Sequence, residues 1–149
     1  MKIYLASPFF NEDETKVYNE VIELLRSEKD LKVFVPREHT IPNAWEMSNS
    51  AWGESVFAVD YLALMNSDVV VVLNFGMYSD SGTAWECGCA FALGKKVVNV
   101  LCGDADTEYS LMMVNGTNIV VTLEEFRVNL FEHILKWYEK EANEKISQK

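Results

Sequence analysis

The sequence has little positive charge, few cysteines and no long apolar run. Thirteen lysines and arginines stand against 23 aspartates and glutamates, which gives a net charge of −10 over 149 residues. Because nucleic-acid polymers and anionic membranes are negatively charged, we expect neither as a partner. The apolar runs are too short for a transmembrane helix, and the first residues predict a strand rather than a signal peptide. We therefore expect a cytoplasmic protein.

The scarce cysteines, histidines and glycines exclude several kinds of site. Cys87, Cys89 and Cys102 are an odd number without C-x-x-C spacing, so we expect free thiols in a reducing compartment. His39 and these cysteines do not form a set of metal ligands, and we predict no metal and no cofactor. His39 is interpreted as a structural or pocket-rim residue. The glycines form neither a dinucleotide fingerprint nor a P-loop.

The apolar content, 49%, is enough for one globular domain over residues 1–149, with a charged tail after about residue 139 that we expect to fray. Short β-branched runs alternate with helical patterns along the chain. Strands are predicted at 3–6, 31–35, 69–73, 97–101 and 118–121. Helices are predicted to begin near Asn11, Glu54, Ala84, Ser110 and Thr122. This alternation predicts an α/β fold, a doubly wound five-stranded parallel sheet in the flavodoxin-like order 2-1-3-4-5.

The segment from Asp68 to Leu93 most strongly suggests a site. A buried strand is followed by a polar loop, Gly76 to Gly82, and then by a helix. In a doubly wound fold, ligands bind at the carboxyl ends of the strands, here at the switch point between the first and third strands. The loop Ser7 to Phe10 is therefore expected to face the loop Gly76 to Gly82 across one crevice.

Three acidic residues are candidates for chemistry at this crevice. Asp80 and Glu86 have structural interpretations as well, because Asp80 can cap the helix and Thr83 with Glu86 matches a capping box. The nearby helix N-terminus is expected to favour the ionised form of Glu86. Asp60 lies on the apolar stripe of its helix, where a carboxylate must be paired, hydrogen-bonded or functional. Three acids beside aromatic residues suggest glycosyl chemistry, with one nucleophile and one proton donor.

The sequence resembles the nucleoside 2-deoxyribosyltransferase family over roughly residues 3–114. The motifs concerned are IYLASPFF, PREH, the spacing of Asp60 and Asp68, DSGTAWECG from Asp80 to Gly88, and SLM from Ser110 to Met112. The resemblance implies transfer of a 2-deoxyribosyl group between nucleobases, by a retaining double displacement through a covalent glycosyl-enzyme. It implies deoxynucleosides and free nucleobases as partners, and a homohexamer with shared active sites.

By this resemblance Glu86 is the nucleophile, Tyr4 positions it, and Asp60 and Asp80 contact the base and manage its proton. Phe9 and Phe10 line the base pocket, and Met112 is donated across a subunit interface. The residues expected to bind substrate are Ser7, Phe9, Phe10, Arg37, Gly82, Ser110 and Met112. Two features depart from the family pattern: Ser110 stands where many members carry Asn, and the charged tail differs from their short C-termini.

Two other functions stay open. A hydrolase of the same architecture would cleave the N-glycosidic bond of nucleoside 5′-monophosphates, with Ser7, Ser81 and Arg37 as the available phosphate ligands. A nucleotide-sensing module would use the acids only to order its loops. A preference for purine or pyrimidine bases, and tolerance of ribose, also stay open at this stage.

Overall fold

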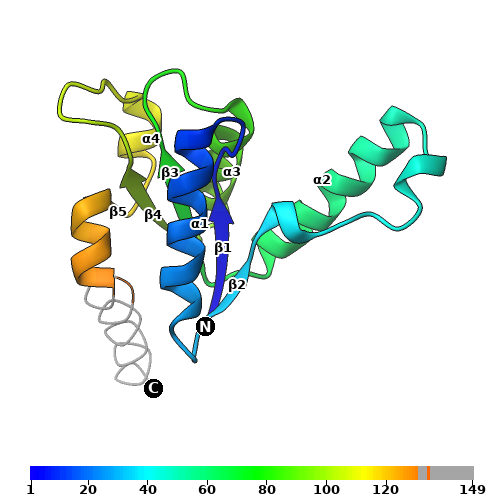
Figure 1. Cartoon of the computed structure of the whole chain (residues 1–149), viewed down its shortest axis with the longest axis horizontal. Helices are drawn as coiled ribbons and strands as arrows, with labels where there is room; N and C mark the ends of the chain where they lie inside the picture. The colour runs from blue at the N-terminus through cyan, green and yellow to red at the C-terminus, as the bar shows by residue number, and fades with distance from the viewer. Residues whose placement is uncertain (131–133, 135–149) are drawn as a thin grey trace.

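One parallel sheet organises the chain (Figure 1). The computed structural model describes residues 1–130 and 134. The strands are β1 (Lys2–Ala6), β2 (Lys32–Phe34), β3 (Val69–Asn74), β4 (Lys96–Leu101) and β5 (Ile119–Thr122). All neighbouring strands are parallel, in the order β2-β1-β3-β4-β5. The predicted doubly wound α/β fold is confirmed, including its strand order.

The helices are α1 (Glu12–Arg26), α2 (Asn49–Met65), α3 (Ser81–Ala92) and α4 (Leu111–Asn115), and residues 123–130 are also helical. Their starts follow local capping chemistry. The Asn11 side chain accepts the backbone N–H of Glu14 at 2.9 Å, as predicted for the cap of α1. Thr122 and Glu125 form the reciprocal bonds of a capping box before residues 123–130. The charged tail after residue 139 lies outside the described residues.

The predicted start of α2 near Glu54 is wrong, because the helix begins at Asn49. Ser48 is the N-cap, and its hydroxyl accepts the backbone N–H of Ala51 at 3.2 Å. In the first turns of α2 the only apolar side chains, Ala51 and Trp52, are adjacent and are followed by Gly53, so these turns lack the apolar repeat that marks the later turns. A turn without an apolar repeat can therefore be helical where only its cap indicates it.

Helices cover both faces of the sheet, which is why all of β3 is buried. On one face, α1 and residues 123–130 pack through side chains such as Tyr18, Leu25 and Phe126. On the other face, Tyr4, Val70 and Val72 pack against Leu64 of α2, Cys87 and Ala90 of α3, and Met113 of α4. The site therefore has to be built on the second face, where α2, α3 and β1 meet.

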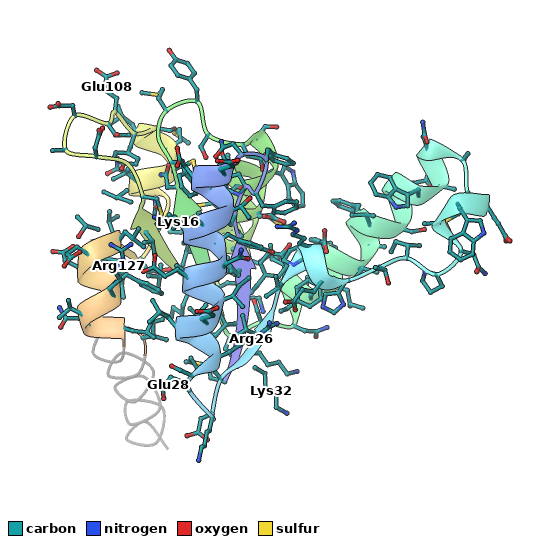
Figure 2. The ribbon with its side chains drawn as sticks, in the orientation of Figure 1. Lys16, Arg26, Glu28, Lys32, Glu108 and Arg127 are labelled. Atoms are coloured by element: carbon teal, nitrogen blue, oxygen red, sulfur yellow. The ribbon has the colours of Figure 1, made fainter. Side chains whose placement is uncertain are left out.

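Two arginines on helices of the first face form ion pairs with glutamates. In Figure 2 the labelled Lys16, Arg26 and Arg127 belong to α1 and to the helix after β5. Arg26 pairs with Glu38 at 2.5 Å, and Arg127 with Glu20 at 2.5 Å. These partly exposed pairs contribute little stability each, but they place these cations away from the face that carries α3.

Helix α2 extends away from the sheet like an arm (Figure 1). Leu64 is its only buried residue, while Trp52, Phe57 and Leu62 are exposed. Lys95 donates to the carbonyls of Met65 and Ser67. Its positive charge therefore lies at the C-terminus of α2, where the helix dipole is negative. Within the described part of the chain, no helix has the length and apolarity needed to cross a membrane. So much exposed apolar surface is typical of a binding surface.

Candidate active site

A cavity of about 440 Å³ opens between α2, α3 and β1. This volume is in the range of small-molecule sites, and most of the wall is apolar or aromatic, as such sites usually are. The lining residues are Tyr4, Trp52, Gly53, Val56, Phe57, Asp60, Tyr61, Leu64, Gly82, Trp85 and Glu86. Four residues predicted for the site, Tyr4, Asp60, Gly82 and Glu86, are brought together here.

Tyr4 and Glu86 form the polar end of the cavity. The Tyr4 hydroxyl donates to Oε1 of Glu86 at 2.5 Å, across the interface between β1 and α3. A donor paired with a carboxylate makes a short and strong hydrogen bond. Because α3 begins at Ser81 with Asp80 as its N-cap, Glu86 lies in the second turn and bonds to Tyr4. The capping-box interpretation of Thr83 and Glu86 is therefore wrong.

The pKa of Glu86 is raised to about 7, chiefly by burial; the Tyr4 hydrogen bond works against this rise, and the charges of Asp60 and Asp80 contribute to it. The expected preference for the ionised form is thus outweighed, because the loss of hydration destabilises the carboxylate more than the helix N-terminus and Tyr4 stabilise it. Burial, followed by the Glu86 charge, also raises the pKa of Tyr4, so this hydroxyl keeps its proton. Glu86 can change its protonation state near neutral pH.

Asp60 faces the same cavity from α2 and is partly buried. Burial raises the pKa of this carboxyl, and the nearby His39 lowers it. The two cavity acids interact, since the Asp60 charge raises the pKa of Glu86. Two carboxyl groups in one apolar cavity, each with a raised pKa, are the kind of pair that divides into a nucleophile and a proton donor.

Asp80 caps α3. Its Oδ2 accepts the backbone N–H of Thr83 at 2.7 Å and the Thr83 hydroxyl at 2.9 Å. A Cβ atom on Gly82 would lie 3.0 Å from the same Oδ2, so glycine allows the close turn. The structural interpretation of Asp80 is confirmed by these bonds, and its contact with a base stays a prediction. Asp68 is also structural, since its Oδ2 accepts the N–H of Lys2 at 2.7 Å and joins β1 to the start of β3.

The loop after β1 does not line this cavity, in contrast to the expected crevice between two loops. Phe9 packs on Tyr18 of α1, with ring centroids 5.5 Å apart. The Arg37 guanidinium lies 5.4 Å from the centroid of the Phe9 ring. Phe10 is exposed, and the Ser7 hydroxyl donates to the carbonyl of Pro8. The reason is that Phe9 packs against the core on the α1 face, across the sheet from α3. Their substrate roles stay predictions.

Ser110 and Met112 line a second cavity, of about 610 Å³, between α3 and α4. Met112 is 83% exposed and its neighbour Leu111 is 76% exposed. Neither Ser110 nor Met112 contributes to the wall of the cavity that holds Glu86 within this chain. An exposed methionine beside a cavity is suited to contact another molecule.

Sequence analysis did not predict an aromatic cluster in the cavity wall, formed by Phe57, Tyr61 and Trp85, or the lining residue Gly53. The rings of Phe57 and Tyr61 stack at 5.6 Å, and Trp85 meets Phe57 edge-on at 5.5 Å. This cluster joins α2 to α3 beside Glu86. A usable signal was present: Phe57 and Tyr61 are four residues apart on the side of α2 that carries Asp60, and Trp85 precedes Glu86.

His39 ends a stack of rings that begins at Tyr4. The Tyr4 and Phe34 centroids are 5.4 Å apart, and those of Phe34 and His39 are 4.1 Å apart, with nearly parallel planes. This placement agrees with the interpretation of His39 as structural. Among the residues that the structure describes, no group of three or more His, Cys, Asp or Glu side chains could hold a metal ion.

Comparison with known proteins gives one matching family. The model of the nucleoside 2-deoxyribosyltransferase family matches residues 3–135. A 2-deoxyribosyltransferase from the psychrotolerant bacterium Bacillus psychrosaccharolyticus is 33% identical, with a TM-score of 0.71 over 81% of this chain and 85% of that one. No curated protein matches significantly.

Two more distant structures share the fold. A 2-deoxyribosyltransferase from Leishmania mexicana is 21% identical, with a TM-score of 0.61 over 90% of this chain and 99% of that one. A CMP N-glycosidase from Clostridium botulinum is 20% identical, with a TM-score of 0.60 over 87% and 98%. At this identity the likeness concerns the fold alone.

Removing the Tyr4 hydroxyl is expected to raise the pKa of Glu86 above about 7, because Tyr4→Phe deletes the donor that stabilises the carboxylate. Carbon-13 NMR titration of the glutamate carboxyls measures this pKa, with Glu86→Gln used to assign the signal. Tyr61→Phe is the control, since Tyr61 lines the same cavity. An unchanged or lower pKa in Tyr4→Phe would show that the hydrogen bond does not control this group.

Proposed function

Because the chain belongs to the nucleoside 2-deoxyribosyltransferase family, we propose that it transfers a 2-deoxyribosyl group from one nucleobase to another through a covalent glycosyl-enzyme on Glu86. The observation that carries the proposal is the contact between Tyr4 and Glu86 at the end of a cavity that also holds Asp60. A fixed carboxylate and a second acid are the two groups that a retaining displacement needs.

Glu86 is the proposed nucleophile. Its carboxylate attacks C1′ of the sugar, the C1′–N bond breaks, and the electron pair goes to the departing base. The pKa of about 7 leaves a useful fraction of the charged form at neutral pH in the free protein. Tyr4 holds one oxygen of the carboxylate, which fixes the direction of attack. The apolar lining is proposed to favour a nucleobase over water as the acceptor of the sugar from the glycosyl-enzyme.

Asp60 is the proposed proton donor to the leaving base. A nucleobase leaves poorly unless it is protonated, so an acid that keeps its proton longer than usual suits the role. Burial raises the pKa of Asp60 in this direction. When the second base attacks C1′, the C1′–O bond to Glu86 breaks and the proton of the incoming base passes to Asp60. Asp80 is proposed to assist at the base from its place at the N-terminus of α3.

A hydrolase of nucleoside 5′-monophosphates is the alternative, and it needs ligands for the phosphate. Of the candidates Ser7, Ser81 and Arg37, none lines the cavity of Glu86. Ser7 already donates to a carbonyl, and the Arg37 guanidinium stacks on Phe9. This placement favours a nucleoside over a nucleotide as the substrate. The mechanism also requires no metal or cofactor.

Incubation with deoxyinosine and cytosine is the direct test of the function. We expect deoxycytidine and hypoxanthine to form together, since the sugar passes from one base to the other. Glu86→Ala is the negative control. A nucleotide hydrolase would leave both compounds unchanged and instead release base from deoxycytidine monophosphate, and a sensing module would form no product from any of them.

A 2′-fluoroarabinosyl nucleoside is expected to label Glu86. Fluorine destabilises the oxocarbenium-like state, so both formation and breakdown of the glycosyl-enzyme become slow. Without an acceptor base, intact mass spectrometry should show the gain of one fluorosugar, and peptide mapping should place it on Glu86. A label on Asp60 or Asp80 would mean that the carboxylates have other roles, and an inverted product would exclude a double displacement.

We also propose that the protein acts as a homo-oligomer, a hexamer by the family resemblance, in which Met112 reaches the site of a neighbouring subunit. The support is the exposed apolar surface, at Leu111 and Met112 on α4 and at Trp45, Trp52 and Leu62 on or before α2. Surface of this kind is stable in water when another subunit covers it.

Met112→Glu is expected to lower the sedimentation coefficient and the transfer rate together, because a charge would be buried at the subunit contact. Analytical ultracentrifugation at assay concentration measures the first, and the deoxycytidine assay measures the second. Val128→Glu is the matched control, since Val128 is also exposed but lies on the helix at the opposite face of the sheet. A fully active monomer would contradict the shared site.

A further inference from the structure

The cavity of Glu86 continues along α2, well beyond the acids. Gly53, Phe57, Asp60 and Leu64 recur at helical spacing and form one stripe of its wall. Gly53 is seven residues before Asp60, which corresponds to about 10 Å along the helix axis. At that distance the wall is formed by Gly53 together with its neighbour Trp52, so part of this end of the cavity has no side chain.

Neither the backbone nor the packing of α2 explains this glycine. The positive φ angles among glycines belong to Gly76 and Gly94, so Gly53 has a backbone conformation open to any residue. A Cβ atom built on Gly53 meets no heavy atom within 4 Å. A glycine inside a helix makes the helix less stable than an alanine at the same position would. Folding of this chain therefore does not require glycine at position 53.

Gly82, the other glycine of the cavity wall, makes a useful contrast. Its Cβ would press against Asp80, so the cap of α3 accounts for it. Gly53 has no such neighbour, and the space in front of it belongs to the cavity. A ligand that starts at Glu86 and passes Asp60 along α2 would have its most distant atoms beside Gly53.

We propose that Gly53 sets the size of the nucleobase that the cavity accepts, and that its missing side chain admits the second ring of a purine. The inference rests on the proposed function, because the sugar must lie at Glu86 for the base to extend along α2. A one-ring base would occupy the space near Asp60 and leave the region of Gly53 free. A two-ring base would fill this region and contact the helix backbone.

The test compares adenine with cytosine as acceptors, with deoxyuridine as the common donor, so that only the second half-reaction differs. Gly53→Leu is expected to lower the ratio of kcat/KM for adenine to kcat/KM for cytosine at least tenfold, mainly by raising the KM for adenine. Gly53→Ala should shift the ratio in the same direction, at least twofold, while raising the melting temperature. If Gly53→Leu does not fold, the ratio measured for Gly53→Ala tests the inference instead.

Ala58→Leu is the matched control, because Ala58 is exposed on α2 and does not line the cavity. It adds the same side chain to the same helix and should leave the ratio unchanged. A ratio that does not move in the Gly53 variants, or that moves as much in Ala58→Leu, overturns the inference, as does a wild-type protein that transfers to cytosine but not to adenine. A wild-type protein that transfers to neither base, from deoxyuridine or from deoxyinosine as the donor, overturns the proposed function and the inference with it.

Discussion

The burial of the Glu86 carboxylate against Tyr4 is the constraint on which the rest of the site depends. A buried carboxylate needs a hydrogen-bond donor, or must bind a proton and become neutral, and both are possible for Glu86. Tyr4 supplies the hydrogen bond from a fully buried position in β1, and the raised pKa of Glu86 supplies the second option. Because both residues sit on packed elements, the carboxylate is held in one place.

Helix α2 places Asp60 near Glu86, but in doing so it leaves apolar side chains exposed to water. Only its last turns pack on the sheet, through Leu64, and Lys95 closes its end. The rings of Phe57, Tyr61 and Trp85 join it to α3 at the level of Glu86. The outer part of α2 forms the cavity wall, and its uncovered side is suited to contact a neighbouring subunit.

Much of the fold could be predicted from the sequence because strands and helix starts depend on local sequence patterns. The β-branched run at 69–73 predicted a buried parallel strand, and the alternation of strands with helices predicted the observed order. Side-chain caps such as Asn11 and Thr122 placed two helix starts. The start of α2 was missed because the residues before Glu54 include Gly53 and only two, adjacent, apolar residues, so they show no apolar repeat.

The sequence by itself determined the sheet, the helix on which Glu86 lies and the presence of Asp60 on an apolar stripe, since these follow from periodicity, capping and motif. Only the tertiary structure decided which partners meet. It turned Phe9 toward Tyr18 on the other face and gave Gly53 open space. It also showed that the contact between Tyr4 and Glu86, which the family resemblance implied, is a hydrogen bond across 82 residues. The physical reason is that burial and contact depend on how whole elements pack, which no local pattern specifies.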